Sequence, residues 1–576
     1  MDNKKQIKTL RPLKKGKKPK KYAVVDTETW GLGGKLAFGV VYISDVDYHV
    51  FYNKEQFYKI LEKQNIQTVY AHNLDFDAIK IRDQTSLEGT TDALFAGGLL
   101  LTFKDEKGIK WHDSYCLLKS NASKLGEAIG YKKLPTPKKF INPRKSKYIG
   151  KKDIYYCKRD CKIIAEFLQT AFKLIGTQKL TIASAAMFIF RKNYLEKDLI
   201  IRPENELFRH SYYGGRVECF RLGKVNAEVV DINSLYPWAM KKTVFPHPSY
   251  MLTEENPNFR TAMVTIFNYE GMAEIEIYHP KQKIGLLPYR HNGKLIFPYG
   301  LIRGYYNFNE LRFAIKNGCK IKKVYSMVYS RVKLKGFFND FVNDFYFKKN
   351  NSQGAEKLFY KFILNSLYGK FGENKHTKRI YIKASQLNKN VKYLQKVKAE
   401  FKIEQLKRGY YYIDYIKEND KPPIHQIFSL CSYITSTARI KLNENLIKNE
   451  SQVVYCDTDS MAIQGKYKGE VSNNLGSWSH ENYVIQRIVG NKFYKTDKGL
   501  KAKGVPKSAK LVGRQFNYDH FIKSKESLKR GLKAGSTENR NKKVSFDYDK
   551  RKAKRNGDTE ILNVNELITK WKNYWN

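Results

Sequence analysis

Two aspartates stand one residue apart at the end of an apolar run, in the segment Tyr-Cys-Asp-Thr-Asp-Ser of residues 455–460. Residues i and i+2 of a strand face the same side, so Asp457 and Asp459 lie close together in a regular strand or in a hairpin turn. Their like charges repel, and a divalent cation bound by carboxylate oxygens removes that repulsion. The alternative for an isolated pair is a turn whose aspartates accept backbone hydrogen bonds. The segment therefore predicts either a tight turn or a metal site.

A second apolar run supplies another acid in the same kind of position. Residues 227–231 read Ala-Glu-Val-Val-Asp, so Asp231 stands where a β-branched strand stops. Together with Asp457 and Asp459 it gives three acids from two strands, enough to hold two Mg²⁺ ions about 4 Å apart. Two metal ions held in this way would activate a primer hydroxyl and stabilise a leaving pyrophosphate in an in-line displacement.

The charge of the chain indicates a polyanionic partner. Lysine and arginine number 106 against 56 acids, so the formal net charge is +50, and the 576 residues include 41 tyrosines and 33 phenylalanines. Cations that hold phosphates and rings that stack on bases are typical of a nucleic-acid path. An anionic membrane surface is the alternative. The length exceeds that of one ordinary core and predicts several domains.

Membrane segments and disulfides are not expected. No run of 18 apolar residues is present, and the lysine-rich N-terminus lacks the apolar segment of a signal peptide, so the sequence predicts a soluble intracellular protein. The seven cysteines form no C-x-x-C pair, which predicts reduced thiols. Cys157 and Cys161 can share a helix face, but two ligands alone make no structural zinc site.

One predicted helix carries a row of polar side chains. Residues 354–372 have helical periodicity and end at glycine. Lys357, Lys361, Asn365 and Tyr368 follow one another at spacings of three and four, so they share a face. Lysines in a row can bind triphosphate oxygens, and a tyrosine can stack on a sugar or base. The alternative is an ordinary amphipathic surface helix.

The N-terminal third predicts an α/β layer with its own acids. A strand at 22–31 contains Asp-Thr-Glu, a strand and helix start at 67–81 contain His-Asn-Leu-Asp-Phe-Asp, and residues 153–175 have long helical periodicity. Acids thus stand at a strand end, at a helix start and within a long helix.

The ordered motifs D-x-x-S-L-Y-P, K-x-x-x-N-S-x-Y-G and Y-x-D-T-D-S resemble the polymerase motifs of family B DNA polymerases. The resemblance implies that Asp231 and Asp459, with Asp457 beside them, bind the metal ions. It implies a nucleotide pocket in which Tyr236 packs under the incoming sugar and Lys361 holds the triphosphate. The other residues implied for this pocket are Leu235, Lys357, Asn365 and Tyr368.

The N-terminal acids resemble the D-x-E, N-x-x-x-D and Y-x-x-x-D set of DnaQ-like 3′-5′ exonucleases. The resemblance implies that Asp26, Glu28, Asp77 and Asp160 hold two metals and that Tyr156 orients the attacking water. The residues implied to bind the frayed single-stranded end are Tyr70, His72, Asn73 and Phe76. For His72 alone, a structural histidine is an equal alternative.

Further motifs resemble the protein-primed branch of this family, found in small phages with linear genomes. Tyr212, Gly214 and Gly215 match Y-x-G-G, which contacts template; Lys492 and Tyr494 match K-x-Y, which steadies the primer end; and Thr435 and Arg439 match a T-x-x-A-R primer contact. Many relatives have glycine where this last motif has alanine.

The fold class implied by the resemblance is a multidomain α+β protein. It has a ribonuclease-H-like exonuclease domain, followed by a right-hand polymerase with two terminal-protein-region insertions. The expected parts are a flexible basic arm (1–21), exonuclease (22–180), palm (181–250), insertion 1 (251–335), fingers (336–372), insertion 2 (373–425), second palm part (426–505), and thumb with tail (506–576).

The resemblance also implies cofactors and partners. We expect two Mg²⁺ ions per active site, with Mn²⁺ as a substitute, and as partners a primer-template DNA, dNTPs, a terminal protein that primes synthesis and a phage single-strand-binding protein. The expected state is a monomer in the cytoplasm of an infected host cell. The alternatives are a polymerase that starts without a primer or on a nucleic-acid primer, and a non-enzymatic single-strand-binding protein.

Overall fold

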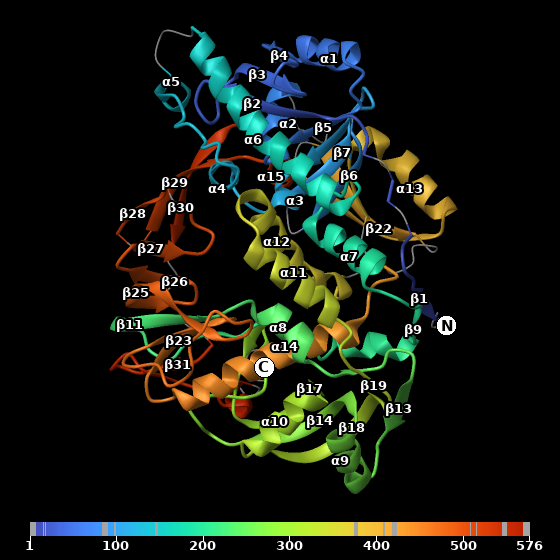
Figure 1. The fold of residues 1–576 in the computed structure, drawn as a ribbon, viewed down its shortest axis with the longest axis vertical. Coiled ribbons are helices and arrows are strands. Elements are labelled where there is room, and N and C mark those ends of the chain that lie inside the picture. The colour runs from blue at the N-terminus through green and yellow to red at the C-terminus, as the bar shows by residue number, and fades with distance from the viewer. Residues whose placement is uncertain are drawn as a thin grey trace.

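The computed structural model describes the chain except for residues 1–6, 15, 18, 83–89, 97–98, 144–147, 374–377, 407–408, 418–422, 507, 514, 544–549 and 568–576. A multidomain α+β architecture is confirmed: sheets and helical layers alternate along the long axis of the molecule (Figure 1). Across the described residues, helices long and apolar enough to traverse a bilayer are not found. All seven cysteines are buried free thiols, as predicted.

The N-terminal domain is built on a seven-stranded sheet of order β4-β3-β2-β5-β8-β7-β6, in which β2, β5 and β8 are parallel. Its strands are β2 (Ala23–Thr29), β3 (Leu36–Tyr42), β4 (Tyr48–Phe51), β5 (Thr68–Ala71), β6 (Thr91–Ala96), β7 (Leu99–Lys104) and β8 (Lys110–Asp113). Its helices are α1 (Lys54–Lys63), α2 (Leu74–Arg82), α3 (Tyr115–Leu118), α4 (Ala122–Ala128), α5 (Lys138–Ile141) and α6 (Lys151–Ile175). The long α6 lays its apolar face over β2 and β3 (Figure 1), as its periodicity predicted.

The expectation of a flexible arm is wrong for the described residues from Ile7 onward. The strand β1 (Lys8–Leu10) pairs antiparallel with β9 (Leu199–Ile201), and Leu10 is fully buried. The segment then follows α7 (Ile182–Asn193), where the Leu13 amide donates to the Arg191 carbonyl over 2.9 Å. The prediction rested on the high density of lysines. It was wrong because the apolar residues among them allow residues 8–10 to pair with β9 and to bury Leu10.

A second seven-stranded sheet, of order β10-β23-β24-β11-β25-β26-β27, joins strands from the two segments expected to form the palm and is termed the palm sheet. Its strands are β10 (Val217–Cys219), β11 (Gly223–Ile232), β23 (Val453–Asp457), β24 (Ser460–Ile463), β25 (Trp478–Gly490), β26 (Phe493–Thr496) and β27 (Gly499–Ala502). Two helices, α8 (Leu235–Lys242) and α14 (Phe428–Lys448), pack against each other beside it, and the 3₁₀ helix η1 (Pro203–Arg209) packs on α14. Above them stands the helix pair α11 (Asn339–Asn351) and α12 (Gly354–Phe371) (Figure 1).

Two further units lie within the chain segments expected to be insertions. The first is a four-stranded sheet of order β13-β18-β14-β17, flanked by α9 (Phe259–Asn268) and α10 (Phe308–Lys316). Its strands and short hairpins are β13 (Met251–Glu255), β14 (Glu270–His279), β17 (Gly300–Asn307), β18 (Lys320–Ser330), β15 (Tyr289–His291) with β16 (Lys294–Ile296), and β12 (Phe245–Pro246) with β19 (Lys333–Leu334). The second is a three-stranded sheet of β20 (Lys378–Lys383), β22 (Tyr410–Lys417) and β21 (Ala399–Gln405) with α13 (Leu387–Lys396) and the short 3₁₀ helix η2 (Ala384–Gln386).

The C-terminal segment forms a small sheet of β28 (Lys510–Val512), β29 (Gln515–Phe521) and β30 (Thr537–Lys543), with α15 (Ser524–Arg530) between the last two strands. This unit, the thumb, extends from the palm toward the N-terminal domain (Figure 1). The chain then returns to the palm through β31 (Lys552–Ala553) and β32 (Thr559–Glu560), where the Thr559 hydroxyl donates to the Cys219 carbonyl over 2.8 Å.

Candidate functional site

The palm sheet brings three predicted carboxylates to one end of its central strands. Asp231 lies opposite Ser460 in the β11–β24 ladder, and Asp457 also pairs with Ser460 across the β23–β24 hairpin. Asp459 sits in the hairpin turn, which Thr458 makes possible by adopting a φ of 60°. The Ile232 amide donates to the Asp459 carbonyl over 2.7 Å, which fixes the turn against the end of β11. Acids that are more than 220 residues apart in sequence thus converge.

These carboxylates repel one another in a partly dry site. Burial, followed by the neighbouring charges of Asp459 and Glu481, raises the pKa of Asp231 to about 7, and the charge of Lys361 opposes this rise. Burial, together with Asp457, raises the pKa of Asp459. Asp457 differs because it forms an ion pair with Lys492, Nζ to Oδ1 2.7 Å. A cluster of this kind requires a cation to hold its charged form.

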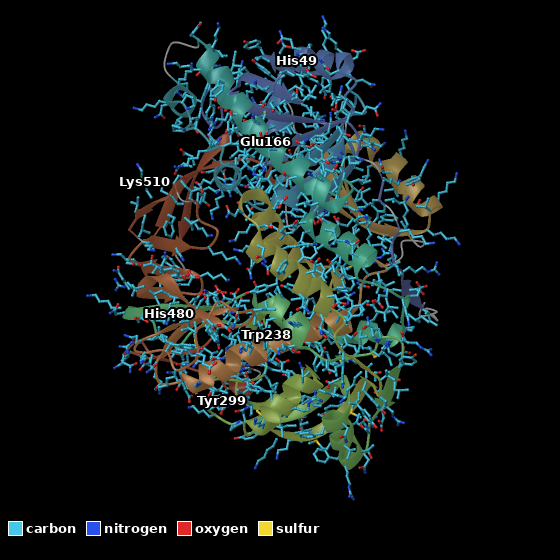
Figure 2. The ribbon with its side chains drawn as sticks, in the orientation of Figure 1. His49, Glu166, Trp238, Tyr299, His480 and Lys510 are labelled. Carbon is cyan, nitrogen blue, oxygen red and sulfur yellow. The ribbon has the colours of Figure 1, made fainter. Side chains whose placement is uncertain are left out.

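Glu481 is a member of this cluster that the sequence did not reveal. It is exposed on β25, and its charge raises the pKa of both Asp231 and Asp459. His480, labelled in Figure 2, precedes it and pairs with Val230 in the β11–β25 ladder. The ladder contains register shifts, so no spacing rule in the sequence would have linked Glu481 with Asp231.

The predicted nucleotide residues meet beside these acids. The Tyr236 and Tyr368 rings are stacked, with centroids 4.2 Å apart, and Lys357, Lys361 and Asn365 are exposed along α12. Lys349 on α11 belongs with them, because burial and then the charges of Lys361 and Lys357 lower its pKa. The prediction for Leu235 is corrected: its side chain is 2% exposed and packs in the main core.

The loop of residues 212–215 lies against the turn that carries the aspartates. A Cβ built on Gly215 would lie 2.8 Å from side-chain atoms of Thr458, so this position requires glycine. The Thr458 amide donates to the Arg216 carbonyl over 2.7 Å. Gly214 is exposed, whereas the half-buried Tyr212 ring packs against Gly372. The loop therefore fixes the turn.

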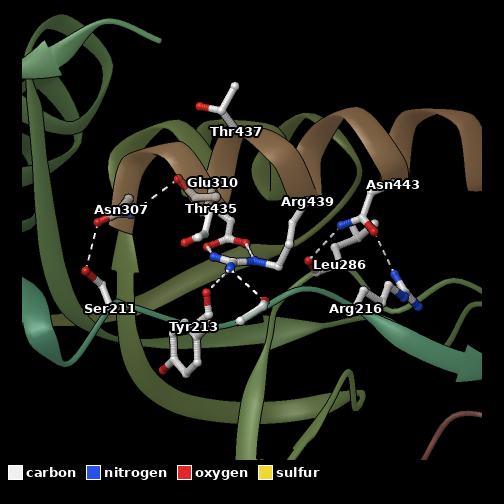
Figure 3. A network of polar contacts seen from close by, with 12 residues as sticks. Ser211, Tyr213, Arg216, Leu286, Asn307, Glu310, Thr435, Thr437, Arg439 and Asn443 are labelled. Carbon is white, nitrogen blue, oxygen red and sulfur yellow. Dashed lines mark hydrogen bonds and ion pairs between the residues drawn. The ribbon is translucent and has the colours of Figure 1, made fainter. Parts of the chain in front are cut away.

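The predicted DNA contact by Arg439 is corrected by its surroundings (Figure 3). Arg439 is 1% exposed; its guanidinium pairs with both carboxylate oxygens of Glu310 on α10, at 2.8 and 3.0 Å. It also donates to the carbonyls of Tyr213 and Gly214, at 2.7 and 3.1 Å. Thr435 is likewise buried, and its hydroxyl donates to the Ser432 carbonyl. Arg439 therefore holds the 212–215 loop to α14 and α10.

Glu310→Gln is expected to lower the free energy of unfolding by about 3–5 kcal/mol, because it leaves the Arg439 charge buried without its partner. Thermal unfolding of the purified chain measures this loss. Arg303→Met is the matched control: it breaks an Arg–Glu pair of the same insertion that lies on the surface, so the unfolding temperature should hardly change. Equal shifts for the two variants would contradict the proposed role of the buried pair.

The N-terminal domain assembles a second acidic cluster. Asp26 and Glu28 lie on β2, Asp77 on α2 and Asp160 on α6. Ligand atoms of Asp26, Glu28 and Cys157 all lie within 4.8 Å of one another. The Thr27 hydroxyl donates to Asp77 over 2.7 Å. Parallel β2 and β5, with α6 above, thus bring together four acids from three separate segments.

The electrostatics of this cluster match those of the palm. Burial raises the pKa of Asp26, and burial with the charge of Asp26 raises the pKa of Glu28 to about 8. Asp77, also buried next to Asp26, has a pKa well above its ordinary value. In all three cases desolvation is the main cause, so their shared charged state needs a counter-cation.

Lys133 supplies part of that charge and was missed in the sequence. Its ammonium pairs with Asp160 and donates to the Tyr156 hydroxyl over 3.2 Å, while its charge opposes the raised pKa of Asp26 and Glu28. The Tyr156 hydroxyl also lies 3.0 Å from that of Thr136. Lys133 is one of many lysines in the sequence and lies in a loop between helices. Only the folded structure shows that it belongs to the site.

The four predicted strand-binding residues occupy different environments. Asn73 is exposed and Phe76 is half-buried. Burial lowers the pKa of His72 to about 4, so it is neutral, with Nδ1 2.9 Å from the Ser114 hydroxyl. The prediction for Tyr70 is corrected, because it is 3% exposed and its ring packs edge-on against Tyr22.

The remaining predicted residues are Lys492, in the turn between β25 and β26, and Tyr494, on β26. Lys492 holds Asp457 as described, and its amide donates to the Tyr455 hydroxyl over 3.2 Å. The Tyr494 ring packs on Tyr455 with centroids 5.5 Å apart. Both residues are thus attached to the strand that carries Asp457.

Known proteins share this architecture. A solved structure of phi29 DNA polymerase complexed with primer-template DNA superposes with a TM-score of 0.67 at 18% identity, covering 92% of this chain and 100% of that one. The fold is thus that of a right-hand DNA polymerase with an additional N-terminal domain. The chain belongs to the family described as DNA polymerase type B, organellar and viral, whose model matches residues 131–460.

Its relatives are fungal and viral. A probable DNA polymerase of Podospora anserina is 29% identical over 415 residues, 63% of this chain and 34% of the relative. The DNA polymerase of Bacillus phage phi29 is 26% identical, over 91% of this chain and 92% of the relative. The chain spans only about a third to a half of the length of the fungal relatives it matches, with coverages of 34%, 52% and 42%.

Proposed function

We propose that the chain is a DNA-directed DNA polymerase that edits its product with a 3′-5′ exonuclease. The observation that supports this most is the convergence of two separate carboxylate clusters, each with raised pKa values, in the palm and in the N-terminal domain. Family membership and the phi29 relative support the polymerase activity. The direct test is extension of a primer-template and degradation of a 3′ end by one purified preparation.

Both clusters fit a hard divalent cation. Their donors are carboxylate oxygens whose pKa values are raised by burial and then by neighbouring negative charges, and Mg²⁺ prefers these oxygens. Asp231, Asp459 and Asp457 would hold Mg²⁺, or Mn²⁺ in its place, in the palm; Asp26, Glu28, Asp77 and Asp160 would hold it in the N-terminal domain. When bound, two ions per site would lower the pKa of the attacking hydroxyl or water and stabilise charge on the reacting phosphate.

In the palm, the chain binds and orients the nucleotide. Lys357, Lys361 and Lys349 form a cationic row for triphosphate oxygens. The stacked rings of Tyr236 and Tyr368 form a flat surface for the sugar, on which bulk at the ribose 2′ position is disfavoured. Lys492 holds Asp457 and so keeps the turn in place.

In the N-terminal domain, Asn73 and Phe76 would bind a single-stranded 3′ end, and their full or partial exposure and their position on the segment that carries Asp77 support this role. The Tyr156 hydroxyl, held by Lys133 and Thr136, is placed to orient an attacking water. Lys133 also offsets the negative charge around Asp160. These residues support an editing site separate from the site of synthesis.

The finer proposal is protein-primed initiation on a linear viral genome, with strand-displacing elongation, in the cytoplasm of an infected host. It is supported by the phage relatives and by the two folded units within the segments resembling terminal-protein-region insertions. The proposed partners are a terminal protein and a single-strand-binding protein, and the enzyme acts as a monomer. Covalent transfer of a labelled nucleotide to a partner protein tests priming; extension of nucleic-acid primers alone would favour the alternative.

The stabilisation that Mg²⁺ gives to the protein should be larger at pH 8 than at pH 6. The folded pKa values of Asp231 and Glu28, about 7 and about 8, exceed the ordinary 3.8 and 4.5. As the pH rises from the ordinary pKa values toward the folded ones, these acids lower the stability of the metal-free protein, because they lose their protons more readily in the unfolded chain. The same deprotonation creates the carboxylate ligands that bind the cation. Thermal unfolding with and without Mg²⁺ measures the effect. Asp26→Asn with Glu28→Gln should reduce it, and an equal Mg²⁺ shift at both pH values would contradict the expectation.

DNA binding should weaken steeply with salt, because a chain of net charge +50 releases counterions from each phosphate it neutralises. With about six to ten phosphates contacted, the affinity falls by a factor of about 10³–10⁵ between about 50 and 200 mM salt. Titration of a labelled primer-template at several salt concentrations gives the slope. A flat response would oppose a phosphate-tracking surface.

A further inference from the structure

The far end of the thumb rests on helix α2 of the N-terminal domain. The Ser524 hydroxyl donates to Asp75 Oδ1 over 2.6 Å, and the Ser524 amide to the same oxygen over 3.3 Å. Asp75 is 7% exposed and Ser524 fully buried. A buried charge-assisted hydrogen bond of this kind is stronger and more specific than a surface contact.

Two further contacts complete the junction. The rings of Phe76 and Phe521 have centroids 5.0 Å apart. Lys80 Nζ donates to the carbonyl of Gly34, in the loop after β2, and to that of Gly535 in the thumb, each over 2.7 Å. A Cβ on Gly535 would lie 2.7 Å from Ile79, and its φ is 77°, so the thumb approaches α2 as closely as backbone allows.

The junction touches the segments that carry the acids of the N-terminal cluster. Asp77 follows Phe76 on α2, and Gly34 lies in the loop that leaves Glu28 on β2. Phe76 is the residue assigned above to the frayed 3′ end, and its ring is in contact with Phe521. A base that stacks on Phe76 therefore has to displace Phe521, or at least share the ring with it.

We propose that this junction, the thumb latch (Asp75, Phe76 and Lys80 with Phe521, Ser524 and Gly535), competes with single-stranded 3′ DNA for Phe76 and so limits the rate of editing. The inference rests on the proposed exonuclease function. A base stacked on an aromatic side chain is a stronger contact than one tilted pair of phenylalanines, so a frayed end can displace Phe521 from Phe76. A paired end offers no free base and leaves the two rings in contact.

The first test is Phe521→Ala, with degradation of a single-stranded oligonucleotide and extension of a matched primer-template as readouts. Degradation should rise about threefold to tenfold, the factor expected from losing one aromatic pair, and extension should not change. Tyr518→Ala is the matched control, because Tyr518 lies on the same strand, β29, and its ring contact is with His520 rather than α2. It should leave degradation unchanged.

The second test closes the latch covalently through Asp75→Cys with Ser524→Cys, whose side chains already meet. Oxidation should suppress single-strand degradation and reductant should restore it, while each single variant should not respond. The latch alone would be overturned if Phe521→Ala lowered degradation or left it unchanged. It would also be overturned if oxidation of the double cysteine variant left degradation unchanged. No degradation by the unmodified chain with Mg²⁺ or Mn²⁺ would instead refute the proposed exonuclease, and the latch with it.

Discussion

Replacing Asp459 with alanine is expected to reduce nucleotide incorporation by about a thousandfold or more. The substitution removes a carboxylate that would hold the catalytic cation, and losing about 4 kcal/mol of charge stabilisation in the transition state corresponds to that factor. Asp231→Asn should have a similar effect, because both acids lie in one cluster, where burial and then neighbouring negative charges raise their pKa values. Single-turnover extension of a primer-template measures the loss.

Glu228→Gln is the matched control for this experiment. Glu228 lies on the same strand as Asp231, but it is exposed and only loosely paired with His480, at 3.8 Å. Extension should therefore be unchanged in this variant, and degradation of a 3′ end should persist in Asp459→Ala. Full extension by Asp459→Ala would remove Asp459 from the proposed catalytic site. No extension by the unmodified chain would remove the polymerase proposal and revive a non-enzymatic, single-strand-binding function.

The second large effect is expected for Asp26→Ala combined with Glu28→Ala. These two acids lie on β2 inside the N-terminal cluster, so their loss should abolish 3′-5′ degradation, by about a thousandfold or more, for the same electrostatic reason. Extension should continue, because the palm acids are carried by other strands. Degradation of a labelled single strand and extension of a matched primer are the two measurements.

The double variant also relieves repulsion, so its metal-free form should be at least as stable as the parent. Glu62→Gln, on the exposed face of α1, is the control for a surface acid of the same domain and should retain both activities. Parallel loss of degradation and extension in the double variant would indicate a structural role for β2.

Acids at strand ends were predictable from sequence, whereas their neighbours were not. Asp231 and Asp457 each end an apolar run. A carboxylate at such a position is a candidate site residue, because carboxylates are rarely buried unless a partner compensates their charge. Lys133 follows another lysine, and Glu481 belongs to no recognisable motif. Each becomes distinct only when a loop or a bulged strand brings it to the acids.

The predictions for Arg439 and Tyr70 were wrong for a different reason. A motif fixes the type of side chain but not whether its polar end faces DNA or the interior. Arg439 pairs with Glu310, which lies on helix α10 more than a hundred residues earlier in the sequence, and that partner turns its guanidinium inward. Tyr70 lies on the central strand β5, where α6 covers it. In both cases tertiary partners decide the role.

The second insertion has a consequence for how the chain is made. Leu406 and Tyr412 complete the apolar cluster of the N-terminal domain, and Tyr381 packs against Phe95 of β6. The ribosome synthesises the N-terminal domain first. The apolar surface that Tyr381, Leu406 and Tyr412 cover would therefore stay exposed until about three hundred further residues had emerged. Biogenesis of this enzyme therefore depends on a late-arriving segment, and the excised N-terminal domain should aggregate unless residues 378–417 are supplied in trans.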